Sequence, residues 1–341
     1  MASYVKALKR EMHLRRQYIK GTRVHTIYIG GGTPSLLPGS SLKEIFDDIS
    51  SCFTIDANAE ITIEANPDDV TPEWLTSLAK TPVNRISMGA QTFNDKLLSF
   101  LGRRHNSQQT INAVEACKEA GLTNISLDLM YGLPRQSFDD WKHDVRLCLS
   151  LGIKHLSAYL LSYEEGTRLD TMLKQGLVRE ADEELSRQMY DYLMSETSKA
   201  GFQHYEISNF ALPGYHSCHN SSYWQGTPYL GLGAGAHSYD GERTRRANMP
   251  DIKAYIAATE DVPHETETLS DKSLYNEFIM TRLRTSAGIP LNELSREDQD
   301  YCLSQAKPHQ AHNLLRIKDE HLCLTKEGIF TSNDIISDLM K

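Results

Sequence analysis

The first half of the chain alternates short runs rich in β-branched residues with amphipathic stretches of helical length. This alternation predicts βα units, in which consecutive strands are parallel and a helix connects each strand to the next. Runs of this kind predict strands at residues 24–29, 61–64, 85–88, 124–129 and 155–160. The stretches between them predict helices at residues 41–49, 72–78, 107–120 and 139–150, several of which begin with a Ser, Thr or Asp cap.

Each predicted strand ends in glycine or polar residues. The segments are GGGTPS after the first strand, EANP after the second, GAQTF after the third, DLMYGLP in the fourth and LLSYEEGT after the fifth. In a βα barrel the carboxyl ends of all strands meet at one mouth, where barrel enzymes place their chemistry. A flat doubly wound sheet would use only some of these ends, at a topological switch point. We favour the barrel and expect a ligand site at its mouth.

Length and charge describe a globular protein without a polyanionic partner. At about 150 residues per domain, 341 residues correspond to about two domains. The chain carries 36 basic and 45 acidic residues, and the net charge of -9 argues against nucleic acid as a partner. No apolar run approaches the ~18 residues that cross a bilayer, so we expect no integral membrane segment and a cytoplasmic protein.

The second half of the chain has a different composition. Residues 201–241 are rich in Gly, Tyr, His and Trp, and their length favours functional loops over a simple connector. After a linker at residues 261–268, helical patterns and a hairpin pattern predict a winged-helix-like packing or lid module. We therefore expect a partial βα barrel at residues 1–200, a Gly- and aromatic-rich region at 201–260, and a C-terminal accessory domain of α+β type at 261–341.

The order of several motifs resembles that of a known family. Along the chain these motifs are GGGTPS, EANPDDVTPEWL, RISMGAQTFND, LGRRH, ISLDLMYGLPRQS, HLSAYLLSYEEGT and HNSSYW. Together they resemble the oxygen-independent coproporphyrinogen III oxidase family of radical S-adenosylmethionine proteins, from about Tyr4 to the C-terminus. HNSSYW, at residues 219–224, resembles the mark of the heme-chaperone branch of that family. The resemblance implies an α/β fold, a partial six-stranded barrel with a C-terminal accessory domain.

The resemblance also implies a set of residues that bind S-adenosylmethionine. Gly31, Gly32 and Thr33 match the glycine motif that lies against the methionyl amino group of the cofactor. The side chains that hold the methionyl carboxylate and the ribose are matched by Glu64, Gln91, Arg103 and Asp128. Their chemistry is appropriate, because a guanidinium can pair with a carboxylate and the other side chains can accept hydrogen bonds. Taken singly, Glu64 and Asp128 could instead cap loops and Arg103 could be a solvated charge.

The family's CxxxCxxC motif, whose thiolates hold a [4Fe-4S] cluster, does not occur in residues 1–341. The six cysteines are scattered, at positions 52, 117, 148, 218, 302 and 323. The motif would lie on a first strand ahead of the helical pattern at residues 4–18, so the partial barrel is expected to lack that strand. Of three explanations, a start site placed too late is preferred over a shortened chain and over a gene that has lost the cluster. We assign no catalytic residue and no metal ligand, and we expect this chain as written not to perform radical chemistry.

Heme is the second ligand that the sequence suggests, with His219 as its axial ligand. His219 lies in a segment that also contains Tyr215, His216, Cys218, Tyr223 and Trp224. Imidazole and thiolate are common ligands of heme iron, and aromatic side chains could stack on a porphyrin. The propionates could meet Arg243, Arg245 and Arg246. The alternative is a structural turn that its tryptophan anchors.

The resemblance implies a heme chaperone that binds heme and S-adenosylmethionine and passes heme to an apo-hemoprotein. One alternative is an oxygen-independent coproporphyrinogen III oxidase, which converts two propionates of its porphyrin substrate to vinyl groups and yields protoporphyrinogen IX. Another alternative is a cluster-free protein that binds S-adenosylmethionine. An open edge of the barrel would carry unpaired backbone groups, and we therefore also expect self-association.

Overall fold

The computed structural model of the protein describes residues 1–21 and 23–341. The chain forms two compact units. The first, which we call the barrel unit, comprises Tyr28–Leu36 and Ile61–Ser217. The second, which we call the terminal unit, comprises Met1–Ile27, Leu37–Glu60 and Cys218–Lys341. The predicted domain limits at residues 200 and 260 stay a prediction.

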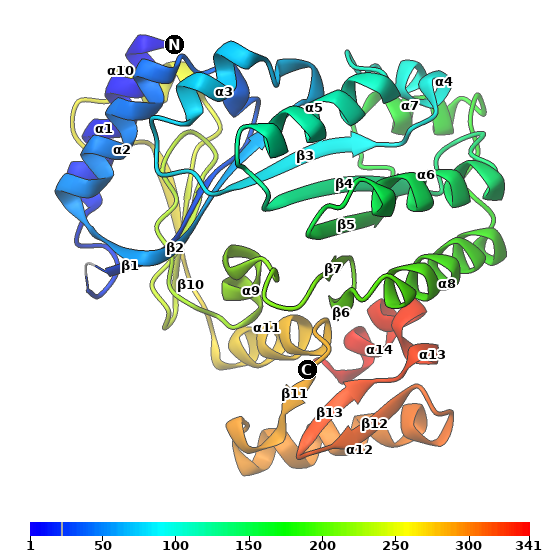
Figure 1. Ribbon diagram of the computed structural model, residues 1–341. Helices are drawn as coiled ribbons and strands as arrows, with labels where there is room; N and C mark the ends of the chain where they lie inside the picture. Colours follow the sequence, from blue (N-terminus) through cyan, green and yellow to red (C-terminus); the bar gives the residue numbers. More distant parts are fainter. Residues whose placement is uncertain (22) are drawn as a thin grey trace. The chain divides into compact units, whose positions relative to one another are not determined.

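Within the described residues, the largest sheet has seven strands in the order β1-β2-β3-β4-β5-β7-β6 (Figure 1). The strands are β1 (Arg23–Ile29), β2 (Thr54–Ala65), β3 (Arg85–Gln91), β4 (Ile125–Tyr131), β5 (His155–Leu160), β6 (Gln203–Glu206) and β7 (Asn209–Ala211). Strands β2 to β5 are parallel, whereas β7 pairs antiparallel with β5 and with β6. The five predicted strands and the α/β class are therefore confirmed. Strands β6 and β7 lie in the region where the sequence predicted loops.

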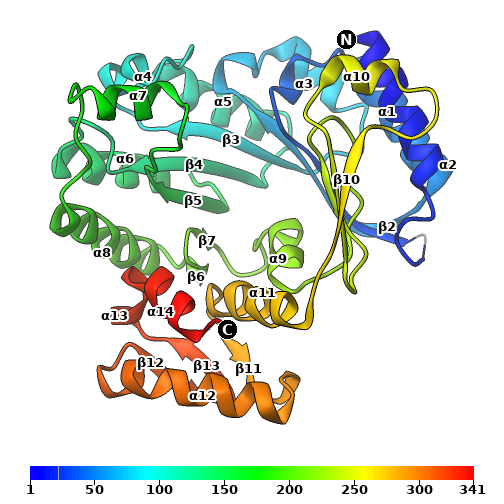
Figure 2. The same ribbon diagram turned by 180° about the vertical axis from the view of Figure 1, so that it is seen from behind.

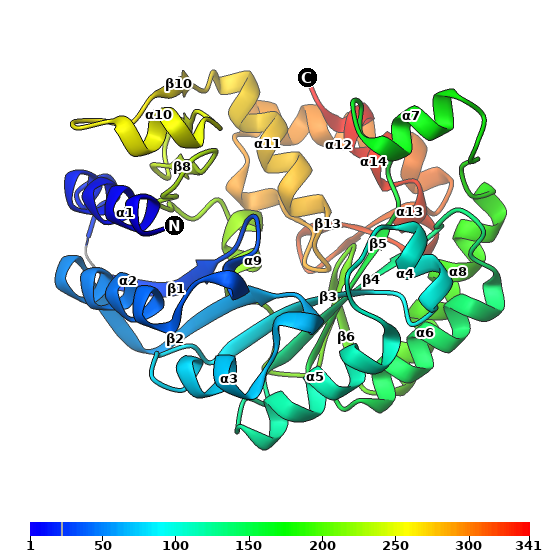
Figure 3. The ribbon, with the colours of Figure 1, turned by 90° about the horizontal axis from the view of Figure 1, so that it is seen from above.

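The helices of the barrel unit are α3 (Pro72–Leu78), α4 (Asp95–Phe100), α5 (Ser107–Glu119), α6 (Phe138–Ser150), α7 (Arg168–Lys174) and α8 (Glu183–Lys199). Helices α3 to α6 lie between successive parallel strands, whereas α7 and α8 lie between β5 and β6. Helices α5 and α6 begin with capping boxes, in which the N-cap side chain and the third helical residue exchange hydrogen bonds. Figure 3 shows α3, α5 and α6 along one side of strands β3 to β5. The predicted helix at residues 41–49 corresponds to α2 (Gly39–Cys52).

The two faces of the parallel strands differ in chemistry. Successive residues of a strand point to opposite faces, so Ile86 and Met88 lie on one face of β3, and Ile125, Leu127 and Leu129 lie on one face of β4; all five side chains are fully buried. The strand register places Glu64 beside Ser87 and Asp128 beside Ser157. These four residues lie on the other face, which we call the polar face. The sequence predicted a ligand at the mouth of the barrel, and two of the residues that the resemblance implies for it, Glu64 and Asp128, lie on the polar face.

The terminal unit contains α1 (Ala2–Arg15), α2, α9 (Cys218–Trp224), α10 (Ile252–Ala257) and a small antiparallel sheet. In this sheet β9 (Thr244–Asn248) pairs with β8 (His237–Tyr239) and with β10 (His264–Thr268). The expected linker at residues 261–268 is therefore wrong for its last five residues, which form an edge strand. No helix in residues 1–21 or 23–341 is both long enough and apolar enough to span a membrane.

The C-terminal segment forms a separate small core within the terminal unit. Its elements are α11 (Asp271–Leu283), β11 (Ile289–Pro290), α12 (Arg296–Ala311), β12 (Leu315–Lys318), β13 (His321–Leu324), α13 (Lys326–Phe330) and α14 (Ser332–Leu339). Ile279, Leu283 and Leu322 are fully buried at its centre. Figure 2 shows its short strands between α12 and the pair α13 and α14. Helices, a hairpin and a final helix occur in the predicted order.

Candidate functional site

The glycine turn after β1 leaves backbone groups accessible. Gly31 and Gly32 have positive φ angles of 77° and 66°, and no atom lies within 4 Å of the place where either Cβ would stand. Gly30 is different, because its Cβ would lie 2.8 Å from Glu64 Oε1 and 2.5 Å from Tyr28 Cε1. A larger residue at position 30 would displace the side chains of Glu64 and Tyr28. The turn thus presents open backbone beside a carboxylate.

Glu64, at the end of β2, is held at both carboxylate oxygens. The Tyr28 hydroxyl donates to Oε1 at 2.7 Å, and the Gly31 backbone N–H donates to Oε2 at 3.0 Å. Burial and the adjacent Glu64 charge raise the pKa of Tyr28, so its hydroxyl remains a donor at neutral pH. Glu64 is therefore fixed against the glycine turn by a residue, Tyr28, that the motif comparison did not select.

Arg103 and Gln91 meet at Gly89. A Cβ on Gly89 would lie 2.7 Å from Gln91 Nε2 and 3.0 Å from Arg103 Nη2. Arg103 Nη2 donates to Asn66 Oδ1 at 3.1 Å and to the Gly89 carbonyl at 3.2 Å. No ion pair of Arg103 occurs among the described residues, and both of these acceptors are neutral. A half-buried guanidinium held by neutral oxygens retains its charge for an anion such as a carboxylate.

Gln91 has an unusual backbone, which a buried aspartate supports. Its φ angle is 65°, in the left-handed region that non-glycine residues rarely adopt. The next two residues are tied to Asp144 on α6: the Thr92 hydroxyl donates to Oδ2 at 2.6 Å and the Phe93 N–H donates to Oδ1 at 2.7 Å. This tether fixes the strand end that carries Gln91.

Asp128 lies on the polar face of β4 with its carboxyl group withdrawn from bulk water. Burial raises its pKa to about 6, although a hydrogen bond from Ser157 and the charge of Arg85 act in the opposite direction. The carboxyl group therefore changes charge close to neutral pH. Arg103 is among the charges that act on it.

The structure thus brings most of the predicted cofactor residues together within the barrel unit. Gly31 contacts Glu64 directly, Gln91 and Arg103 meet at Gly89, and Asp128 shares the polar face with Glu64. The predicted S-adenosylmethionine site stays a prediction, and the residues fit it: the turn exposes backbone for an ammonium group and Arg103 has no acidic partner among the described residues. Sequence reasoning missed Tyr28 and Asn66; the only available signal was that Asn66 lies within the EANP motif.

The cysteines of the described residues do not form a binding site for an iron-sulfur cluster. No cluster of three or more His, Cys, Asp or Glu residues suited to a metal ion occurs in the part of the chain that the structure describes. Cys117, Cys148, Cys302 and Cys323 are buried and unpaired by disulfides, and burial raises the pKa of each thiol. These residues do not fit an iron-sulfur cluster.

The predicted heme residue His219 lies in α9, near its N-terminus. The Glu60 carboxylate accepts hydrogen bonds from the backbone N–H groups of Cys218 at 3.0 Å and His219 at 2.9 Å. The imidazole Nδ1 lies 3.0 Å from Thr26 Oγ1, and Nε2 lies 3.0 Å from the Tyr223 hydroxyl. His219 is therefore placed by side chains of β1 and β2 and by its own helix. Its assignment to heme stays a prediction.

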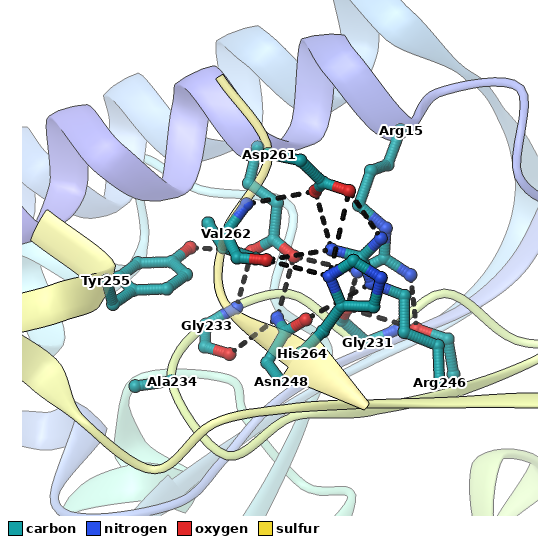
Figure 4. Close-up of polar contacts among 12 residues, drawn as sticks. Arg15, Gly231, Gly233, Ala234, Arg246, Asn248, Tyr255, Asp261, Val262 and His264 are labelled. Atoms are coloured by element: carbon teal, nitrogen blue, oxygen red, sulfur yellow. Dashed lines mark hydrogen bonds and ion pairs between the residues drawn. The ribbon is translucent and has the colours of Figure 1, made fainter. Parts of the chain in front are cut away.

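The three arginines expected to meet heme propionates are paired with acidic residues instead. Arg243 forms an ion pair with Asp271, and Arg245 forms one with Glu277. Arg246 forms a bidentate ion pair with Asp261. Figure 4 shows the pair of Arg246 and Asp261 beside Arg15, Asn248 and Tyr255. These last three side chains donate hydrogen bonds to the buried carboxylate of Glu11. These pairs hold β9 to neighbouring segments. They argue against the expected propionate contacts.

A cavity of about 380 Å³ lies elsewhere in the barrel unit. It is lined by residues 133–136, after β4, and by residues 176–182 and Leu185, around the start of α8. None of the predicted site residues lines it.

Two parts of the chain match models of known protein families. The model of the Radical SAM superfamily matches residues 5–148, and the model of the HemN C-terminal domain matches residues 269–331. The relative named heme chaperone HemW from Lactococcus lactis is 38% identical over 288 residues, which cover 84% of this chain and 75% of the relative. Heme chaperone HemW from Bacillus subtilis is 34% identical over 340 residues, which cover 97% of this chain and 89% of the relative.

A solved structure shares the fold. Coproporphyrinogen III oxidase (HemN) from Escherichia coli, a radical SAM enzyme, superimposes with a TM-score of 0.82 at 20% identity. The match covers 100% of this chain and 83% of that chain. The predicted partial-barrel α/β fold with a small C-terminal domain is confirmed.

Proposed function

Because this chain belongs to the heme chaperone HemW family of radical SAM proteins, we propose that it binds heme and S-adenosylmethionine in the cytoplasm and passes heme to an apo-hemoprotein. The observation that carries the cofactor assignment is the Arg103 guanidinium, which has only neutral partners among the described residues and lies beside Gln91.

The role proposed for each cofactor residue is the one that the family resemblance implies, and the contacts of Arg103 and Glu64 are compatible with it. Arg103 pairs with the methionyl carboxylate of S-adenosylmethionine, which replaces its neutral acceptors with a charge-assisted contact. The glycine turn, with Thr33, offers backbone carbonyls to the methionyl ammonium group. Gln91 and Asp128 accept hydrogen bonds from ribose hydroxyls, and Glu64 holds the turn in place through Gly31. When bound, the cofactor would supply a positively charged sulfonium at the polar face.

The heme assignment depends on His219. A neutral imidazole that a neighbouring hydroxyl orients is a common iron ligand, and His219 has such a neighbour in Thr26. The arginine pairs described above leave the propionates to groups other than Arg243, Arg245 and Arg246. The proposed heme binding therefore depends on His219 as the iron ligand and not on the arginines.

Calorimetry of S-adenosylmethionine binding tests the first half of the proposal. We expect Arg103→Ala to weaken binding at least tenfold, because a buried charge-assisted contact is lost. Arg104→Ala is the matched control, since the neighbouring Arg104 is 55% exposed and already paired with Asp68 and Asp69. If both variants bind S-adenosylmethionine with equal affinity, Arg103 is not part of the cofactor site and the proposed site on the polar face is refuted.

Titration with hemin tests the second half. We expect His219→Ala to lose the Soret band of the bound form and His25→Ala to retain it, because His25 is 71% exposed and pairs with Asp56. A His219→Ala protein with an unchanged Soret band would refute the assignment. In the same preparation, conversion of coproporphyrinogen III to protoporphyrinogen IX would identify the chain as an oxidase and overturn the chaperone assignment.

A further inference from the structure

The imidazole of His219 is held at both ring nitrogens by hydroxyl groups. Nδ1 lies 3.0 Å from Thr26 Oγ1 on β1, and Nε2 lies 3.0 Å from the hydroxyl of Tyr223, one turn further along α9. The two rings meet edge to face, with centroids 5.0 Å apart and an interplanar angle of 83°. Each nitrogen therefore has a defined partner.

The backbone beneath this ring is also fixed. The two oxygens of the Glu60 carboxylate accept the N–H groups of Cys218 and His219, at 3.0 and 2.9 Å. Charge-assisted hydrogen bonds to the first amides of a helix are favourable, because these amides have no partner within the helix. The Glu60 carboxylate therefore holds the backbone to which the imidazole is attached.

The two hydroxyls act differently on the two nitrogens. A neutral imidazole has one N–H and one lone pair, and iron binds through the lone pair. If Nδ1 carries the proton, it donates to Thr26 Oγ1, and Nε2 keeps its lone pair. In this tautomer the Tyr223 hydroxyl donates to Nε2. Histidine ligands of metals usually donate their second N–H to an oxygen in the same way.

We propose that Tyr223 is a latch on the iron-binding nitrogen of His219 and that Thr26 is the positioning residue that keeps this nitrogen unprotonated. This inference rests on the proposed heme binding. The phenol hydroxyl and a heme iron use the same lone pair of Nε2, so heme binds only after Tyr223 has turned away. The cost of breaking this hydrogen bond weakens heme binding and favours release to an acceptor.

The surroundings of Tyr223 suit a movable latch. Its side chain is 39% exposed and contacts Tyr229 edge to face, with centroids 4.8 Å apart, so it is not locked in a core. Tyr223 therefore competes with iron for Nε2 through the hydrogen bond of its hydroxyl to that atom.

Heme affinity of Tyr223→Phe tests the latch. The variant keeps the ring and removes only the hydroxyl, and we expect hemin to bind about three- to tenfold more tightly, with slower transfer of heme to apo-myoglobin. The heme-free variant should lose no more unfolding free energy than one hydrogen bond contributes, about 1 kcal/mol. Equal or weaker affinity in Tyr223→Phe, while His219→Ala still loses the Soret band, would overturn the latch and leave the proposed function intact.

A second pair of variants tests the role of Thr26. Thr26→Val removes the acceptor for Nδ1–H, and we expect weaker hemin binding and a changed electron paramagnetic resonance spectrum of the ferric heme complex. Thr26→Ser keeps the hydroxyl and should restore both. A merely structural role would not move the spectrum. If Thr26→Val gives the wild-type spectrum, Thr26 does not position the ligand; if His219→Ala binds heme normally, the heme assignment itself fails.

Discussion

Asp144 gives a test of how burial and hydrogen bonding hold the strand end that carries Gln91. Its side chain is fully buried on α6 and accepts hydrogen bonds from the Thr92 hydroxyl and the Phe93 N–H, directly after Gln91. Burial raises its pKa to about 6, although both hydrogen bonds lower it. The cost of removing the carboxylate from water therefore exceeds the stabilisation that its two donors provide.

The sign of the pH effect follows from this raised pKa. The folded protein binds the Asp144 proton more tightly than the unfolded chain, whose pKa is near the ordinary value of 3.8. The stabilising contribution is therefore fully present below about pH 4 and is lost as the pH rises through 6. The two pKa values differ by about 2, which corresponds to about 3 kcal/mol of unfolding free energy at 1.36 kcal/mol for each pKa unit.

Asp144→Asn removes the charge and keeps the contacts. The amide oxygen can accept the Phe93 N–H, and the amide nitrogen can donate to Thr92 Oγ1, which can also act as an acceptor. We expect the free energy of unfolding of the variant, relative to the wild type, to rise by about 3 kcal/mol between pH 4 and pH 7. Urea unfolding of both proteins across this range measures the difference. Asp128 also has a raised pKa, but it is present in both proteins and cancels.

Parallel plots of unfolding free energy against pH for Asp144→Asn and the wild type would refute this reasoning. If the difference between Asp144→Asn and wild type does not change with pH, the carboxyl group is ionised in the folded protein with an ordinary pKa. Asp144→Ala is the control for the hydrogen bonds, because it leaves both donors without their acceptor. We expect it to lower the free energy of unfolding by about 2–4 kcal/mol below pH 4, where the charge has no effect.

Three further substitutions test the proposed S-adenosylmethionine site. Tyr28→Phe removes the 2.7 Å hydrogen bond to Glu64, and we expect calorimetry to show about tenfold weaker S-adenosylmethionine binding; unchanged affinity would mean that Glu64 needs no such support. Burial raises the pKa of Asp128 to about 6, so affinity should fall between pH 7.5 and pH 5.5 in the wild type but not in Asp128→Asn; a parallel fall in both would exclude this group. Gly30→Ala should abolish binding without unfolding the protein, because the new methyl group displaces Glu64, and retained affinity would contradict the close approach.

The sequence predicts the parallel strands well because each has a local signal. A short β-branched run, a capped helix and a glycine after the helix are all readable within about twenty residues. The helix at residues 107–120 illustrates this, since its capping box and the glycine that follows it define both ends. Periodicity therefore locates β1 to β5 and the helices between them.

Elements that depend on distant partners are not readable in this way. Strand β10 has the sequence HETET, in which every residue is exposed and the alternation of a half-buried strand is absent. It is a strand because its backbone pairs with β9 along its whole length. The short strands β6 and β7 have the same origin, since their pairing with each other and with β5 is not encoded in three or four residues.

The same distinction applies to the functional residues. Family motifs select Glu64, Arg103 and His219 directly, but they do not show which groups hold these side chains. Tyr28, Asn66 and Thr26 lie 36, 37 and 193 positions from the residues they contact. The ion pairs of Arg243, Arg245 and Arg246 were missed for the same reason, because their acidic partners are distant in the sequence.

These supporting contacts explain why motif residues alone do not define the site. A carboxylate or imidazole binds a ligand more tightly when its donors and acceptors are already oriented, because otherwise part of the binding free energy is used to order them. Glu64 has both oxygens committed before any ligand arrives, and Arg103 has its guanidinium aligned by two neutral oxygens. The imidazole of His219, in contrast, is oriented by one hydroxyl and blocked by another. The first arrangement favours retention of a cofactor, and the second favours a cargo that must leave.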